Sequence, residues 1–273
     1  MKTLQHQTLL YDEDCPLCNL YTNGFIKSKM LDKNGRKPFS KLSIEEQNFI
    51  DIERASNEIA LIDTKHNTVI YGIDSLLKVL GNSMPWIAFI GHLKPVKHGL
   101  KKLYSFISYN RKVIIPNKKS SENVLECVPS FNYKYRLFYI IFSLLITNLA
   151  LFNFSSLLPN ILETNFIIEG VITTGQIIFQ LLFITSLKIK QKFNYIGNLM
   201  TVSLAGSLLL LVMLGLNAVF GLNQLTIVLG FLIIVSLMFL EHQRRVTLLD
   251  FPKHLSYTWI LYRILVLILI LNF

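Results

Sequence analysis

Apolar residues divide the chain into two unlike halves. Beyond about residue 136 they gather in five long runs, at about 137–158, 166–187, 197–221, 225–240 and 256–272. Each run approaches or exceeds the roughly 17–25 residues with which a helix crosses a bilayer. The fourth run is the shortest and follows the third after a tight link, so a re-entrant hairpin is the alternative there. The pattern predicts an all-α transmembrane bundle of about five helices.

The first half has the shorter patterns of a soluble domain. Thr8–Tyr11 is a brief apolar run that suits a buried strand. From Leu17 to Phe25 apolar residues recur at spacings of three and four, which predicts an amphipathic helix. Asp14 suits the N-cap of that helix, and Pro16 suits its first turn. We therefore expect a strand followed directly by a helix near the start of the chain.

The composition agrees with this division. The chain is 52% hydrophobic and 16% charged, where soluble proteins have about 25% charged residues. Residues 1–135 contain 19 of the 27 Lys and Arg residues and 13 of the 17 Asp and Glu residues. A polar stretch at 116–123 has the composition of a linker. We expect a soluble domain at 1–115, a linker at 116–135 and the membrane domain at 136–273.

The net charge of +10 is explained by membrane topology and not by nucleic acid. Basic residues flank alternate ends of the five runs: Lys134, Arg136, Lys188, Lys190, Lys192, Arg244, Arg245 and Lys253. The links 159–165 and 221–224 contain none. The start of the chain also lacks the apolar region of a signal peptide. We therefore expect an inner-membrane (cytoplasmic-membrane) protein whose N-terminal domain faces the cytoplasm.

A few polar side chains fall inside the apolar runs. Gln176 and Gln180 share one face of the second run, at a depth similar to that of Arg263 in the fifth. Hydrogen bonds among these three would hold the helices together. Glu169 lies near the outer end of the second run, where water is close. A transport or quinone site is the alternative interpretation of this group.

Two cysteines carry the most specific chemical signal. Cys15 and Cys18 lie three residues apart where the predicted strand gives way to the predicted helix. The first thiol would be exposed at the N-terminus of the helix, where unpaired N–H groups stabilise a thiolate, and Cys15 is therefore the expected nucleophile. Cys18 lies one turn further on and is the expected resolving thiol. The acids Asp12, Glu13 and Asp14 oppose the helix, so we expect a moderate, thioredoxin-like pKa for Cys15.

Two other readings of the pair stay open. The cysteines could be a structural pair of buried thiols. A structural zinc site would need two more ligands, and Cys127, His66, His92 and His98 form no CxxC-like or CxxH-like partner for the pair.

The pattern Asp12-x-x-Cys15-x-x-Cys18 after a short strand resembles the DCC thiol–disulfide oxidoreductase family (DUF393). The resemblance continues through a hairpin at 58–72, a helix at 74–80 and Pro85-Trp86. It ends at about residue 115, after an element similar to the family's terminal Tyr…Asn-Arg, here Leu103-Tyr104…Tyr109-Asn110-Arg111.

The resemblance implies a thioredoxin-like α/β domain with dithiol–disulfide exchange activity. By the same analogy Asp12 would accept a proton from Cys18, with a plain turn residue as the alternative. Thioredoxins carry a cis-proline that faces the active-site disulfide, whereas the comparable positions 55–57 contain no proline here.

We therefore predict a membrane-anchored thiol–disulfide oxidoreductase whose site is Cys15, Cys18 and Asp12. No cofactor or metal is expected beyond the redox-active disulfide, and the partner would be a protein or small-molecule thiol or disulfide. A basic segment from Lys94 to Arg111 is expected to face anionic membrane lipid. The alternative is a non-enzymatic assembly or transport-associated subunit with a thioredoxin-like docking domain.

Overall fold

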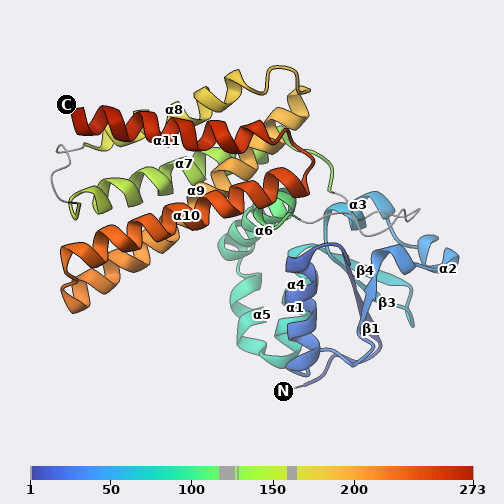
Figure 1. Ribbon diagram of the computed structural model, residues 1–273. Coiled ribbons are helices and arrows are strands. Elements are labelled where there is room, and N and C mark those ends of the chain that lie inside the picture. Colours follow the sequence, from blue (N-terminus) through green and yellow to red (C-terminus); the bar gives the residue numbers. More distant parts are fainter. Residues whose placement is uncertain (1, 117–126, 128, 159–164, 273) are drawn as a thin grey trace. The chain divides into compact units, whose positions relative to one another are not determined.

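The computed structural model describes residues 2–116, 127, 129–158 and 165–272 (Figure 1). The chain forms two compact units, Met1–Tyr135 and Arg136–Phe273. Most of the expected linker, namely residues 117–126 and 128, lies outside the described residues.

The N-terminal unit is built on a mixed four-stranded sheet. Its strands are β1 (Gln7–Tyr11), β2 (Arg36–Pro38), β3 (Ala60–Asp63) and β4 (Thr68–Tyr71). Their order in the sheet is β2-β1-β3-β4. β1 pairs with β2 in parallel and with β3 antiparallel, and β3 pairs antiparallel with β4. This confirms the α/β fold and the hairpin that the sequence predicts.

The described residues of this unit also form seven helical segments. They are α1 (Pro16–Lys27), a 3-10 turn (Phe39–Lys41), α2 (Ile44–Gln47), α3 (Ile52–Asn57), α4 (Ile73–Ser83), α5 (Pro85–His92) and α6 (Lys94–Ile114). Because α1 joins two parallel strands, β1, α1 and β2 form a crossover unit. A hairpin and α4 follow, which agrees with the thioredoxin-like expectation.

Alternate residues of the central strands enter two separate cores. Leu9 and Leu61 are buried in a cluster with residues of α1, α4 and α6. Leu10 and Ile62 are buried in a second cluster with the segment from Phe39 to Ala55. The two-residue period of a strand accounts for this division, because successive side chains point to opposite faces. The sheet is therefore covered on both faces, with α1 and α4 on the first (Figure 1).

Gly72 makes the tight connection from β4 to α4. Its φ of +64° lies in the left-handed region, which residues other than glycine rarely adopt. A Cβ at this position would also come within 2.8 Å of Glu58 Oε2. Both the backbone conformation and the lack of space for a Cβ therefore favour glycine at this position.

The C-terminal unit is largely helical. Its helices are α7 (Tyr133–Ser155), α8 (Phe166–Leu182), α9 (Ile189–Phe220), α10 (Gln224–Leu248) and α11 (His254–Asn272). Of the described helices, α7, α9 and α10 are long and apolar enough to cross a membrane, while α8 and α11 are shorter apolar helices. These helices indicate a membrane protein. The expected count of about five is thus approximate, and α10 is one continuous helix instead of a re-entrant hairpin.

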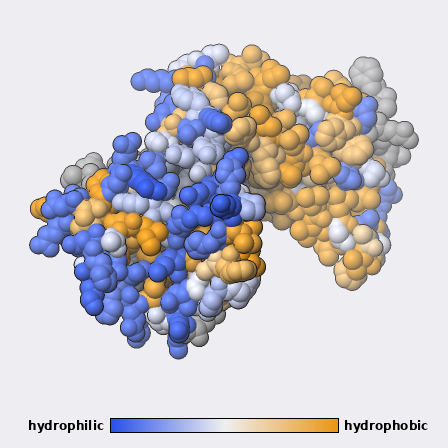
Figure 2. All heavy atoms as spheres, turned by 180° about the vertical axis from the view of Figure 1, so that it is seen from behind, coloured by the Kyte–Doolittle hydropathy of each residue, from blue (hydrophilic) through white to orange (hydrophobic). Residues whose placement is uncertain are grey.

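Large apolar side chains cover the outside of this unit. Residues such as Val219, Leu225 and Leu269 are more than 60% exposed, and Figure 2 shows hydrophobic residues over most of its visible surface. In water such a surface would cost free energy, whereas acyl chains of lipid accommodate it. The surface pattern therefore agrees with a lipid-facing bundle.

The polar interior of the bundle differs from the expectation. Gln180 Oε1 accepts hydrogen bonds from Tyr195 Oη at 2.9 Å and Thr258 Oγ1 at 3.1 Å. Arg263 lies over the ring of Trp259, 5.2 Å from its centroid, and no hydrogen bond joins it to Gln176 or Gln180 among the described residues. Glu169 is 7% exposed, so it is buried among the helices. Spacing along one helix predicts a shared face but not which neighbour each side chain reaches.

Candidate active site

Cys15 is the N-cap residue of α1. Its φ and ψ of −97° and 110° are extended, Pro16 is the first helical residue, and the Cys15 carbonyl accepts from Asn19 N at 3.0 Å. The N-cap is therefore Cys15 and not Asp14, the residue that the sequence predicts for this position. The backbone N–H of Asp14 instead donates to Asp12 Oδ1 at 3.1 Å, within a turn closed by Cys15 N and Asp12 O. The thiol of Cys15 is thereby held at the helix N-terminus.

The two thiols are close, buried and unoxidised. Cys15 and Cys18 are free cysteines that are 1% and 5% exposed. We expected the first thiol to be exposed at the helix end, and its burial corrects that expectation. A substrate disulfide can therefore reach Cys15 only when the surrounding groups move apart.

The surroundings of Cys15 favour its thiolate form. A hydrogen bond from the Cys18 thiol is the main influence that lowers the pKa of Cys15, to about 6, against the opposing effect of burial. The positive charge of Arg111 also lowers this pKa, and the negative charge of Asp12 raises it. The same hydrogen bond and its own burial raise the pKa of Cys18. The pair therefore consists of one thiolate-forming sulfur and one proton-holding sulfur, as nucleophilic and resolving thiols require.

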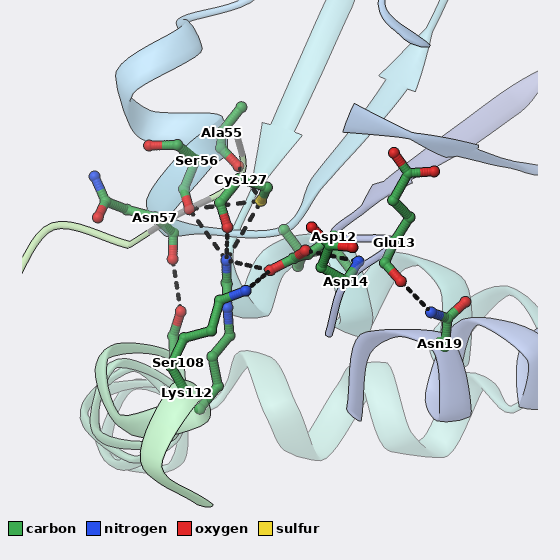
Figure 3. A network of polar contacts seen from close by, with 12 residues as sticks. Asp12, Glu13, Asp14, Asn19, Ala55, Ser56, Asn57, Ser108, Lys112 and Cys127 are labelled. Atoms are coloured by element: carbon green, nitrogen blue, oxygen red, sulfur yellow. Dashed lines mark hydrogen bonds and ion pairs between the residues drawn. The ribbon is translucent and has the colours of Figure 1, made fainter. Parts of the chain in front are cut away.

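Asp12 is a buried carboxylate that is paired with two cations. Its Oδ2 lies 3.3 Å from Arg111 Nη2 and 3.1 Å from Lys112 Nζ (Figure 3). The Asp12 side chain is 5% exposed and that of Arg111 is 7% exposed. A buried charge is stable only with such partners, so the ion pair fixes both side chains beside the cysteines.

Arg111 is a further residue of the candidate site, and the sequence did not indicate its position there. It was assigned to a lipid-facing basic segment, but its side chain is buried and Nη2 donates to Ser56 O at 3.3 Å and Cys127 O at 2.8 Å. Burial alone would lower the pKa of Arg111, but the nearby Cys127, Cys18 and Asp12 raise it overall, so the group stays a cation. This guanidinium supplies the fixed positive charge of the site.

Helical spacing contains the signal that could have placed Arg111 inside. Tyr104, Ser108 and Arg111 lie at spacings of four and three, on one face of α6. Tyr104 Oη accepts from Ile59 N at 2.7 Å, and Ser108 Oγ donates to Asn57 O at 2.6 Å. The face that ends at Arg111 is therefore the face that packs on the domain.

The turn before Cys15 tolerates Glu13. Its carbonyl accepts from Asn19 Nδ2 at 2.8 Å, and its carboxylate accepts from Ser40 Oγ. Glu13 is not among the described residues with a positive φ, so its backbone lies outside the left-handed region that favours glycine. The side chain instead connects the turn to the segment that follows β2.

Metal ligands are not gathered in this domain. Within the described ranges, no group of three or more His, Cys, Asp or Glu side chains is arranged to hold a metal ion. The remaining cysteine, Cys127, contacts Arg111 and not a histidine cluster.

The comparison with known families agrees with this geometry. Residues 9–115 match the family described as DCC1-like thiol-disulfide oxidoreductase. No curated protein and no solved structure matches the chain. The matched range begins in β1, contains both cysteines and ends just after α6, so it coincides with the α/β domain that holds the site. Residues 9–115 are thus similar to DCC1-like thiol-disulfide oxidoreductase domains, and helices that can cross a membrane follow them.

Proposed function

We propose that the chain is a membrane-anchored thiol–disulfide oxidoreductase with Cys15 as nucleophile and Cys18 as resolving thiol. The observation that carries this proposal is the position of Cys15 at the N-terminus of α1, with a pKa of about 6 that depends first on the Cys18 hydrogen bond. A thiolate is the nucleophilic form of cysteine, and a pKa near 6 makes it the main form at neutral pH.

The reaction needs only the groups of the site and a substrate disulfide. The Cys15 thiolate attacks one sulfur of the substrate, which forms a mixed disulfide and releases the other substrate sulfur as a thiolate. Cys18 then gives its proton to Asp12 and attacks Cys15 Sγ. The mixed disulfide breaks, the second substrate thiolate leaves, and Cys15–Cys18 is the oxidised product. The substrate gains two electrons and the Cys15–Cys18 pair loses two, so no further cofactor is required.

The basic pair around Asp12 would assist both steps. Arg111 lies close enough to lower the pKa of Cys15, which favours the attacking thiolate. Asp12 borders the same small cavity as Cys18, where it can receive a proton. Arg111 and Lys112 hold the carboxylate in position, so Asp12 serves as a proton acceptor and Arg111 as a positioning residue.

The same proposal places the domain on the cytoplasmic face of an inner membrane. Its support is the distribution of Lys and Arg beside alternate ends of the apolar helices. The helical unit would anchor the domain near membrane-bound partners. No cysteine lies in residues 136–273, so thiol chemistry remains with the N-terminal domain.

Anionic lipid is the second partner that we propose for this domain. α5 and the turn after it expose Trp86 (63%), Phe89 (73%) and Leu93 (45%), and Lys94 and Lys102 are exposed on α6. Aromatic and aliphatic side chains beside lysines are the composition of an interfacial helix on an anionic bilayer. This apolar surface of α5 replaces the face around Arg111 as the expected lipid contact.

An exchange assay on the purified full-length protein tests the catalytic role. Reduction of insulin or of dithionitrobenzoate by the wild-type protein should be abolished by Cys15→Ser. Cys18→Ser should instead allow the first attack and accumulate a mixed disulfide, which mass spectrometry identifies together with the trapped partner. Wild-type protein without exchange activity, and without a Cys15–Cys18 disulfide in any redox buffer, would support a non-enzymatic docking subunit instead.

A further inference from the structure

Cys127 lies beside the cysteine pair although it is more than one hundred residues away in sequence. Its Sγ accepts a hydrogen bond from Arg111 Nη2 at 3.3 Å, the same nitrogen that contacts Asp12 (Figure 3). Its Sγ also lies 3.8 Å from Ala55 O and 3.6 Å from Ser56 O. Arg111 thus positions Cys127 from one side and the end of α3 positions it from the other.

A shared cavity connects Cys127 with the proposed resolving thiol. Cys18, Cys127, Asp12 and Arg111 all line one cavity of about 10 Å³. Cys15 is not among the lining residues of this cavity. The side chains of Cys18 and Cys127 therefore border one small space. Cys18 is thus the member of the pair that shares this cavity with Cys127.

We propose that Cys127 is a third redox thiol, which attacks Cys18 in the oxidised site and forms a Cys18–Cys127 disulfide. This inference rests on the proposed function, because the Cys15–Cys18 disulfide is its starting point. Cys127 gives its proton to Asp12, its sulfur bonds to Cys18 Sγ, the Cys15–Cys18 bond breaks, and Cys15 leaves as a thiolate. One disulfide replaces another, so no external oxidant or reductant takes part.

The chemistry of the three sulfurs favours this direction of attack. The leaving sulfur, Cys15, lies at the N-terminus of α1 and near the positive charge of Arg111, which both stabilise a thiolate, and a stabilised thiolate leaves faster. Burial raises the pKa of Cys127 to about 11, although Arg111 opposes this effect. Because Cys127 must lose its proton and Cys15 leaves as a thiolate, the ratio of Cys18–Cys127 to Cys15–Cys18 should rise with pH.

The exchange returns Cys15 to its thiolate form while the domain still carries a disulfide. A second substrate could then be attacked by Cys15 before the first pair of electrons has left the protein. The segment after α6, which lies beyond the matched range 9–115, would in this way take part in the reaction.

Peptide mapping of the full-length protein under non-reducing conditions tests the proposal. Cys15→Ser leaves only Cys18 and Cys127, and treatment with diamide, which is reduced as the disulfide forms, should link these two residues. Cys18→Ser is the matched control, and it should give at least about tenfold less Cys15–Cys127 disulfide because only Cys18 borders the shared cavity. Wild-type protein oxidised once and quenched with acid after incubation at pH 7, 8 and 9 should show the predicted rise in Cys18–Cys127.

The outcomes separate this inference from the proposed function. The proposed function requires only that Cys127→Ser still forms the Cys15–Cys18 disulfide. If it does, but Cys15→Ser stays reduced and the wild type shows no Cys18–Cys127 at any pH, Cys127 is not a redox thiol. The proposed function then stands without it. If Cys127→Ser also fails to form Cys15–Cys18, both proposals are wrong. If Cys18→Ser forms Cys15–Cys127 as readily as Cys15→Ser forms Cys18–Cys127, the assignment is also wrong, because oxidation would then be unselective.

Discussion

At the scale of single residues, the site depends on charges that act on Cys15 in opposite directions. Arg111 and the Cys18 hydrogen bond lower the pKa of Cys15, while burial and Asp12 raise it. In the sequence, the acids before the cysteines indicate the effect that raises the pKa of Cys15. The compensating cation was not evident, because Arg111 comes from a helix that ends about one hundred residues later.

The first prediction concerns the pH dependence of Cys15 alkylation. Because only the thiolate reacts, the rate of iodoacetamide modification at Cys15 should rise with pH around a midpoint of about 6. Cys18 should stay unreactive over the same range, because its pKa is raised. Mass spectrometry of each cysteine peptide from the reduced protein measures both. A Cys15 midpoint near the ordinary value of 9.0 would show that the site does not activate it.

The second prediction concerns the Asp12–Arg111 ion pair. Arg111→Met removes a cation and leaves Asp12 with less compensation, so it should raise the Cys15 midpoint and cost roughly 3–5 kcal/mol in the free energy of unfolding. Asp12→Asn should lower the same midpoint slightly, because the carboxylate acts to raise it. Scanning calorimetry and the alkylation profile measure the two effects.

Lys112→Met is the matched control for Arg111→Met. Lys112 contacts the same Asp12 oxygen at 3.1 Å, but its side chain is 29% exposed. Water can screen and replace this contact, so we expect a smaller loss of stability than for Arg111→Met. Equal losses of stability in the two variants would mean that burial of the Asp12–Arg111 ion pair does not determine its contribution to the free energy of unfolding.

At the scale of elements, sequence patterns predicted those features that depend on local periodicity. The strand at Thr8–Tyr11, the helix after the cysteines and the hairpin followed by a helix all appear in the structure. The cap of α1 was placed one residue early because Asp14 is the better N-cap by residue type, whereas Pro16 fixes the first helical position. The burial of Cys15 and the contacts of Arg111 depend on distant segments, which periodicity does not describe.

The third prediction concerns α5 as a lipid-binding surface. The chain contains two tryptophans, Trp86 and Trp259, of which the first is 63% exposed and the second 1%. In Trp259→Phe protein reconstituted with anionic lipid, acyl chains brominated near the headgroup should quench Trp86 fluorescence, because an interfacial helix inserts its apolar face to about 5–10 Å. Removal of the anionic lipid should weaken the quenching. Trp86 emission typical of water, unchanged by brominated lipid, would contradict the proposed contact.

At the scale of the whole molecule, the chain combines an α/β domain with an apolar helical unit. The averages of 52% hydrophobic and 16% charged residues describe neither unit by itself. The runs of apolar residues predicted the helices, but not that α9 begins at Ile189 or that α10 continues to Leu248. Polar ends such as Lys190 and Arg245 extend these helices beyond the apolar stretch, where hydropathy gives no signal.

The fourth prediction concerns topology. Reporter fusions after residues 162 and 223 should show an external location, and a fusion after residue 190 a cytoplasmic one, because the basic residues lie beside the third site only. Alkaline phosphatase and a fluorescent protein active only in the cytoplasm provide complementary signals. The reverse pattern would move the cysteine pair to the opposite side of the membrane.

The fifth prediction tests the central claim that Cys15 and Cys18 are a redox-active pair. The full-length protein is equilibrated in buffers of graded dithiothreitol or glutathione potential, the remaining thiols are alkylated in acid, and each cysteine peptide is quantified. We predict that Cys15 and Cys18 lose alkylation in one shared two-electron transition in Cys127→Ser, where no third thiol can exchange with their disulfide. In the wild type, Cys18 should lose alkylation in a two-electron transition, with Cys15 or Cys127 as its partner. Cys15→Ser should abolish the Cys15–Cys18 disulfide. Two thiols that remain fully alkylated across the whole range of potentials would contradict the account.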